Sequence, residues 1–428
     1  MTADALLRGR ARRVIPGGLW GHLNADKLPP GYPQFFARAE GAHLWDVDGR
    51  RVVDFMCSWG PIVLGHHHPA VEAAARRQAV LGDCMNGPAP VLVELAETLV
   101  QMVPHADWCL FEKNGGDATT ACVTIARAGT GRRKVLVARG SYHGAVPWCS
   151  PSLAGVTAED RAHIIAFDYN DVASLEAAAA QAGHDLAAVL VTAFRHDMSR
   201  TLELPLPAFA QAARRLCTAA DAALILDDVR AGFRIALGGS WEPLGVQPDL
   251  AAYSKAIANG HALAAVTGRD RFRAAAASVF TTGSFWCAAV SMAAALATLA
   301  ELRRLDAPVR LRAMGQRLRT GLEHLAARHV VPIVQSGPPQ MPLLQIAGDE
   351  DFRLGTLFCA EALRHGAYFH PRHNMFLSCA HTEADIDEAL QAADAGFAAV
   401  AREGGGSEAE HVIQGEGPFA VHQPVIAE

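Results

Sequence analysis

The sequence predicts an α/β protein in which helices enclose a mostly parallel sheet and a smaller α+β domain is built from both chain ends. Its 428 residues are 50% hydrophobic and 19% charged, which is enough for a large core and two lobes. Between residues 92 and 268, continuous apolar runs alternate with helical patterns, as expected for strands covered on both faces. Longer helical patterns begin at Ser291, so helices dominate the second lobe.

Turn and capping residues place the elements along the chain. Residues 1–18 predict an amphipathic helix that ends at Pro16. Residues 41–56 predict two strands around an Asp48-Gly49 turn, and we expect this hairpin to pack with the C-terminal lobe. The strands of the large sheet are predicted in KVLVARG, HIIAFDYND, LAAVLVTAF, AALILDDV, LAAYSK and HALAAVTG. The expected divisions are an N-terminal segment joining the small domain (1–60), a large domain (61–290), a C-terminal small domain (291–400) and a tail (401–428).

Composition argues against several classes of function. The net charge of −6 and the lack of a Lys/Arg block argue against nucleic acid or an anionic membrane as partner. No apolar run is long enough to span a membrane. The nine cysteines are scattered without a CxxC motif, which indicates neither zinc nor a disulfide framework and favours a cytoplasmic protein. His66, His67 and His68 have no carboxylate or cysteine at ligand spacing, so we predict no metal.

Two charged residues at strand ends suggest the chemistry. Asp227 ends the strand-like run AALILD, and Lys255 follows the run LAAYS. Because ligands of open α/β sheets bind beyond the carboxyl ends of the strands, we expect both side chains to face one crevice. A lysine amine forms a Schiff base with a carbonyl cofactor, and a carboxylate keeps the pyridine nitrogen of pyridoxal phosphate protonated. Taken alone, each residue is better explained as a solvated or capping side chain.

Two further segments fit a phosphate and a flat ring. Asn114, Gly115 and Gly116 precede a helical pattern, where backbone N–H groups and the helix dipole make an anion cradle. Tyr142 and His143 follow the strand KVLVARG, and Tyr142 is placed to stack on a cofactor ring. Each segment also has a simpler explanation, as a loop-to-helix turn or as ordinary packing. Their coincidence with the Lys255 and Asp227 pair favours a binding site.

The chain carries, in order, the motifs RVIPGG, GAHLWDVDGRRVVDF, SWGPIVLGHHHP, FEKNGGDATTACVTIARAGTGRRKV, YHGA, LILDDVRAGFR, YSKAIANG and FLSCAHTEADID. Together they resemble the class III pyridoxal-phosphate-dependent aminotransferases, and most closely the branch of the glutamate-1-semialdehyde aminomutases. The resemblance spans about residues 10–400 and implies an enzyme of fold type I with pyridoxal 5'-phosphate as cofactor.

The resemblance implies roles for individual residues. Lys255 is the catalytic lysine that binds the cofactor as a Schiff base, Asp227 contacts the pyridine nitrogen, and Tyr142 stacks on the ring. Gly115 and Gly116 bind the phosphate through their amides, with Asn114 and His143 beside the cofactor. Ser284 matches the position from which a neighbouring subunit supplies a hydroxyl to the phosphate. The resemblance thus implies a homodimer with active sites at its interface, acting on a small-molecule amino donor and an oxo acceptor.

Differences between this sequence and the family motifs bear on which substrate we expect. Asn24 stands near the place where the aminomutases carry an arginine, and a neutral amide cannot form a charged pair with a substrate carboxylate. Trp20, Ser58, Trp59 and Trp286 lie in motifs expected to line the site, which suits an aromatic or apolar substrate, although they can equally fill a dimer interface. We therefore predict an aminotransferase for such an amino acid or amine. The alternatives are a glutamate-1-semialdehyde-type aminomutase or an amino acid racemase or epimerase on the same fold, or a non-catalytic module that binds pyridoxal phosphate.

For four polar residues the sequence leaves two possible roles open. Arg230 and Arg234 can bind a substrate carboxylate or pair with neighbouring groups. His370 and Asn374 can reach the pocket from the small lobe or simply cap it.

Overall fold

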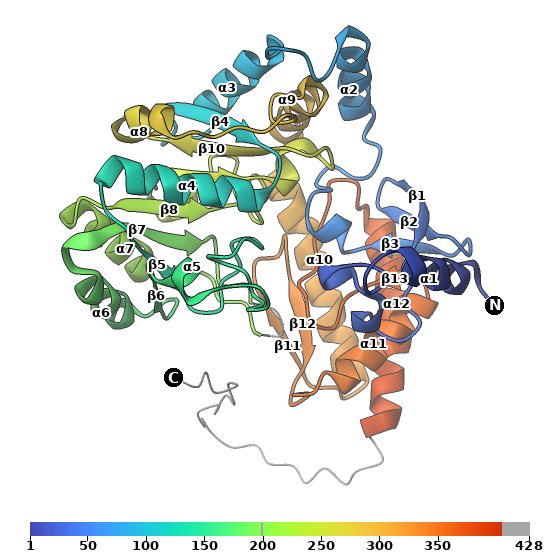
Figure 1. Cartoon of the computed structure of the whole chain (residues 1–428). Helices are drawn as coiled ribbons and strands as arrows, with labels where there is room; N and C mark the ends of the chain where they lie inside the picture. The colour runs from blue at the N-terminus through green and yellow to red at the C-terminus, as the bar shows by residue number, and fades with distance from the viewer. Residues whose placement is uncertain (198–199, 405–428) are drawn as a thin grey trace.

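A seven-stranded sheet forms the core of one half of the molecule, on the left in Figure 1. The computed structural model describes residues 1–197 and 200–404, so the predicted tail lies outside the described residues from 405 onward. The strand order is β4-β10-β9-β8-β7-β5-β6. The strands are β4 (Trp108–Glu112), β5 (Lys134–Ala138), β6 (Ile164–Phe167), β7 (Leu186–Thr192), β8 (Ala223–Asp227), β9 (Leu250–Tyr253) and β10 (Ala264–Gly268).

Strands β6, β5, β7, β8 and β9 run parallel, whereas β10 is antiparallel to both β9 and β4. The predicted α/β class with a mostly parallel sheet is therefore confirmed. The apolar runs correctly locate six of the seven strands. Strand β4 is the exception, because its short sequence WCLFE mixes a cysteine and a glutamate into the apolar residues.

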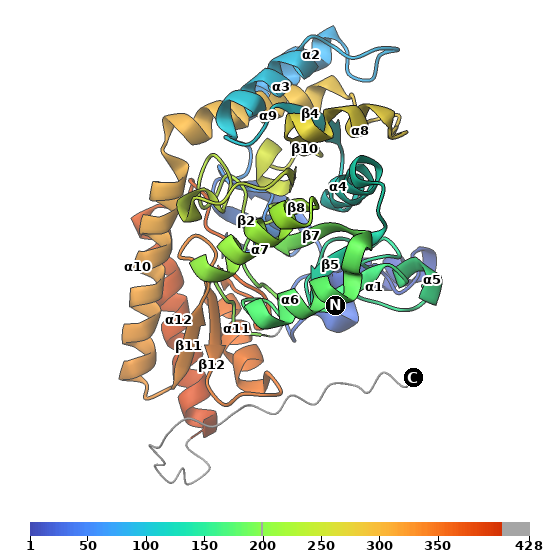
Figure 2. The same cartoon turned by 90° about the vertical axis from the view of Figure 1, so that its left-hand side faces the viewer.

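Both faces of this sheet are buried, which explains its continuous apolar strands. In β8, Leu224 and Leu226 join the core beneath α7 (Pro207–Ala219), while Ala223 and Ile225 join the core beneath α4 (Gly115–Thr130). Figure 2 shows the two helices on opposite sides of the sheet. Because side chains alternate along a strand, Asp227 follows Ala223 and Ile225 onto the α4 face.

The two chain ends share a second sheet. Strands β1 (Phe36–Glu40), β2 (His43–Asp46) and β3 (Arg51–Asp54) are antiparallel, with Gly49 at φ +88° in the predicted turn. Strand β3 pairs in parallel with β13 (Ala367–Tyr368), so the hairpin packs with the C-terminal part of the chain as expected. A separate hairpin joins β11 (Ile333–Ser336) and β12 (Leu343–Ile346).

Helices complete the layers around both sheets. The predicted first helix is α1 (Ala3–Val14). The others are α2 (Pro69–Leu81), α3 (Val91–Met102), α5 (Ala158–Arg161), α6 (Val172–Ala182), α8 (Arg273–Ser278), α9 (Ala289–Arg304), α10 (Ala307–Arg328), α11 (Arg353–Arg364) and α12 (Glu383–Gly404). Within the described ranges, no helix combines the length and the apolar character needed to cross a membrane.

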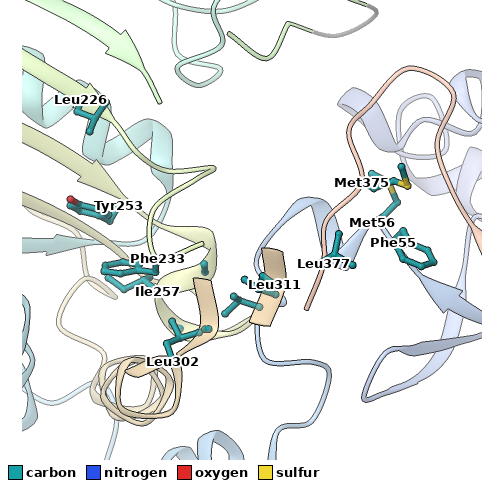
Figure 3. Close-up of a cluster of buried hydrophobic side chains, with 14 of the residues drawn as sticks. Phe55, Met56, Leu226, Phe233, Tyr253, Ile257, Leu302, Leu311, Met375 and Leu377 are labelled. Carbon is teal, nitrogen blue, oxygen red and sulfur yellow. The ribbon is translucent and has the colours of Figure 1, made fainter. Parts of the chain in front are cut away.

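One buried cluster joins the large sheet to the C-terminal part of the chain (Figure 3). It contains Leu226 and Tyr253 from the large sheet, Leu302 from α9, Leu311 from α10, and Leu377. Since these side chains are almost completely buried, the strand ends of β8 and β9 are held in a fixed relation to the loop that carries Leu377.

Candidate active site

Lys255 lies two residues after β9, with its backbone in the left-handed region at φ 48°. Its Nζ donates a hydrogen bond to the carbonyl oxygen of Trp59 at 2.8 Å. Burial lowers the pKa of Lys255 to about 7, and the nearby cation Arg230 contributes in the same direction. A large fraction of this amine is therefore neutral near pH 7, as nucleophilic attack requires.

A left-handed turn brings the Trp59 carbonyl to this lysine. Cys57, Ser58 and Trp59 have φ values of 46°, 54° and 66°, which non-glycine residues rarely adopt. Asp54 holds the turn, because its Oδ1 accepts hydrogen bonds from two following amides at 2.8 and 2.9 Å and its Oδ2 meets His66 at 2.9 Å. Such strained backbone persists only where its surroundings fix it.

Asp227 is buried and held from two sides. Its Oδ2 accepts a hydrogen bond from Nδ1 of the buried His143 at 2.7 Å, and its Oδ1 accepts one from the amide of Val229 at 3.2 Å. The carboxylate is thus fixed in direction on the α4 face of the sheet.

The N-terminus of α4 offers backbone amides beside this carboxylate. Gly115 and Gly116 are its first two residues, and the backbone and side-chain amides of Asn114 both donate to Asp117. A Cβ on Gly144 would lie 2.9 Å from the Cα of Gly116, so the loop after β5 approaches the helix too closely for a side chain. The first N–H groups of a helix lack partners within the helix, and two glycines in succession let a phosphate approach them closely.

A hydrogen bond connects α4 to the loop that carries Tyr142 and His143. The hydroxyl of Thr119 in α4 donates to the carbonyl of His143 at 2.6 Å. Tyr142, which precedes His143, remains half-exposed, with its ring available for stacking. The structure thus brings Lys255, Asp227 and Tyr142 to the carboxyl ends of strands β5, β8 and β9, where the sequence places them.

Other predicted site residues lie further out. Ser284 is exposed, Trp20 is 70% exposed, and the indole of Trp286 packs against Gly283. The side-chain oxygen of Asn24 accepts from the amide of Asp26 at 2.9 Å, within its own loop. Ser58 is exposed beside Trp59.

The two arginines after β8 differ in their partners. Arg234 is fully buried and donates to the carbonyls of Leu377, Gly60 and Ile62 at 2.6, 2.7 and 3.2 Å, so it serves the backbone rather than a substrate. Arg230 donates from Nη1 to the Asn374 side chain at 3.0 Å. Among the described residues, no group of three or more His, Cys, Asp or Glu side chains is placed to hold a metal ion.

A buried amine of low pKa, a fixed carboxylate and a glycine-flanked helix start, all at the strand ends of an α/β sheet, define a pyridoxal-phosphate-dependent enzyme. The family "Aminotransferase class-III" matches residues 28–394. The chain therefore belongs to the class III aminotransferases, and it is a pyridoxal-phosphate-dependent aminotransferase.

Individual relatives support the assignment to this family. An aminopentol aminotransferase from Sphingopyxis macrogoltabida is 48% identical over 402 residues, covering 94% of this chain and 95% of that protein. The solved structure of the PLP internal aldimine form of the FumI protein from Sphingopyxis sp. MTA144 is 48% identical with a TM-score of 0.93, covering 94% and 97% of the two chains. A glutamate-1-semialdehyde 2,1-aminomutase from Polaromonas naphthalenivorans (strain CJ2) is 33% identical, covering 93% of this chain and 97% of that protein.

Proposed function

We propose that Lys255 binds pyridoxal phosphate covalently, that Asp227 faces its ring nitrogen, and that Gly115 and Gly116 hold its phosphate. When bound, the cofactor supplies an electron sink for the carbanion of the substrate. His143 keeps Asp227 in position through its 2.7 Å hydrogen bond. Once displaced by the amine of the donor, the Nζ of Lys255 carries the proton that leaves the substrate carbon.

The proposed amino donor is an amine with an apolar or aromatic body, and it is not recognised through a carboxylate. The observation that carries this proposal is the neutral side chain of Asn24, which offers a substrate carboxylate no positive charge. Its side-chain oxygen accepts a hydrogen bond from within its own loop. Trp59, whose backbone carbonyl accepts the hydrogen bond from Lys255, brings an aromatic side chain to the same turn. The name of the relative with 48% identity, an aminopentol aminotransferase, agrees with an amine as donor.

Assays with one and with two substrates test this proposal. With pyruvate as acceptor, we expect hexan-2-amine and 1-phenylethylamine to be converted at higher kcat/KM than glutamate. Neither amine should react in steady state without pyruvate, because transfer requires both partners. Racemisation of a single amino acid, or isomerisation of glutamate-1-semialdehyde at a comparable kcat/KM, would instead identify a racemase or an aminomutase.

We also propose that Arg230 pairs with the carboxylate of the oxo acid. Its Nη1 is bonded to Asn374, and its fork geometry suits a carboxylate. Arg230→Gln should raise the KM for pyruvate by about tenfold or more while changing the KM for hexan-2-amine much less. Equal changes in both constants would assign Arg230 a general structural role.

We propose that the enzyme works as a homodimer in which Ser284 faces the active site of the partner. Large apolar side chains are exposed near this residue, since Phe280 and Phe285 are 91% and 65% accessible in the single chain. A patch of this kind is typical of a protein interface. The molar mass in solution, measured by light scattering, should be twice the 45.4 kDa of one chain.

A further inference from the structure

Three histidine rings surround the indole of Trp59. The ring centroids of His22, His373 and His370 lie 4.5, 4.9 and 5.5 Å from that of Trp59, all in edge-on arrangements. The backbone carbonyl of Trp59 accepts the hydrogen bond from Lys255, and the charge of Lys255 contributes to lowering the pKa of both His22 and His373, so this cluster lies near the reacting amine. The proposed cofactor contacts do not use these histidines, so they are available for the substrate.

Hydrogen bonds define the proton positions on His370 and His373. The Nδ1 of His370 accepts a hydrogen bond from the amide of Arg372 at 3.1 Å, so the ring proton is on its Nε2. The Nδ1 of His373 lies 2.9 Å from the carbonyl oxygen of Asn374, which can only accept, so this Nδ1 carries the proton and Nε2 is bare. His370 thus presents a donor and His373 an acceptor.

Both rings are neutral at physiological pH. Burial lowers the pKa of His370 to about 4, with a further contribution from Arg372. Burial and the charge of Arg230 lower the pKa of His373 well below its usual value. In residues 1–197 and 200–404, no hydrogen bond is formed by the Nε2 of either ring.

Apolar side chains form most of the cavity wall that the two imidazoles share, and the charges of Arg372 and Arg230 act on His370 and His373 from nearby. Both rings line a narrow cavity between β12 and α11, whose other walls include Leu344, Phe358, Phe369 and Met375. Their centroids are 6.2 Å apart and the rings are nearly perpendicular, at 84°. One oxygen atom bridges two ring nitrogens with hydrogen bonds of about 2.8 Å when the nitrogens lie within about 5.6 Å of each other, and rings with this centroid separation reach that range when their Nε2 atoms turn toward one another.

We propose that His370 and His373 bind a hydroxyl group of the amino donor, with the Nε2–H of His370 donating to the hydroxyl oxygen and the Nε2 of His373 accepting its proton. A hydroxyl both donates and accepts, whereas a carboxylate only accepts and an ammonium only donates. The pair therefore selects amino alcohols among the amines that the enzyme converts. This inference rests on the proposed aminotransferase function with an amine as donor.

Matched donors test the proposal with the full-length holoenzyme and pyruvate. The donors are hexan-2-amine and three 2-aminohexanols with the hydroxyl on carbon 3, 4 or 5. At least one aminohexanol should exceed hexan-2-amine in kcat/KM by about tenfold, mainly through a lower KM, as expected for one hydrogen bond in a pocket that excludes water. The preferred position then gives the distance from the amine to the histidine pair.

Substitutions of the two histidines test whether they cause the preference for the aminohexanol. His370→Phe and His373→Phe should each reduce the ratio of kcat/KM values towards one while leaving hexan-2-amine within about threefold of the wild type. His370→Gln, which keeps an N–H donor near the position of Nε2, should restore part of the preference. His365→Phe is the control, because His365 is a mostly exposed histidine that follows α11 in the same part of the chain.

The outcomes separate this inference from the function on which it rests. If the wild type converts amines with equal kcat/KM with and without the hydroxyl, the inference is wrong and the aminotransferase function stands. A preference that survives in both phenylalanine variants also overturns it, since other residues then recognise the hydroxyl. If no amine is converted with any oxo acid, the proposed function itself fails. The wild-type comparison decides even if a variant does not fold.

Discussion

Lys255→Ala is expected to abolish transamination, with kcat falling by about 10⁴-fold or more. The Nζ of this residue is both the proposed covalent attachment point and the group that carries the proton, so no other amine replaces it. Treatment with borohydride followed by mass spectrometry should find the cofactor fixed to Lys255 in the wild type and to no residue in the variant. Coupled assays with hexan-2-amine and pyruvate measure the loss of turnover.

Lys134→Ala is the matched control for this experiment. Lys134 begins β5, at the opposite end of the strands from the site, and its Nζ donates to the carbonyls of Gln181 and Ala182. This variant should keep covalent attachment and turnover close to the wild type. Substantial turnover in Lys255→Ala, or attachment of the cofactor to another lysine in the wild type, would show that the assignment is wrong.

The fold was largely predictable because the buried strands have a simple sequence signature. The runs AALIL and LAAY are buried at every position, as both faces of the sheet are covered, and their ends therefore locate Asp227 and Lys255. Strand direction carries no such signature. Strand β10 is antiparallel to both β9 and β4, an orientation seen in the register of its pairs, such as Ala265 with Tyr253 and Val266 with Leu110.

The site was less predictable where backbone conformation decides the contact. The carbonyl of Trp59 reaches Lys255 only because three successive non-glycine residues adopt positive φ, which no composition rule anticipates. The sequence signal for this turn is Asp54 at the end of a strand, since an aspartate in that position often accepts hydrogen bonds from the next backbone amides. The sequence names His370 as a residue that can reach the pocket but does not name His373, because the proposed role of His373 depends on a hydrogen bond to the next residue's carbonyl.

Asp227→Asn is expected to reduce kcat by about 10³-fold while the cofactor stays attached to Lys255. The amide keeps the shape of the carboxylate and still accepts a hydrogen bond from His143, but it removes the negative charge that would keep the ring nitrogen protonated. Turnover should fall, whereas cofactor content, measured by absorbance after gel filtration, should remain near one per chain. Loss of the cofactor along with activity would show that Asp227 serves mainly for binding.

Asp228→Asn decides whether strand alternation correctly selects between the two adjacent aspartates. Asp228 is also buried, with its Oδ2 accepting from the amide of Ser240 at 2.8 Å, and burial raises its pKa to about 6. Alternation places it on the face opposite to α4, away from the phosphate cradle at Gly116. Its replacement should therefore leave kcat within a few-fold of the wild type and act on stability instead. If Asp228→Asn lost as much activity as Asp227→Asn, the α4 face would not be the side that binds the cofactor.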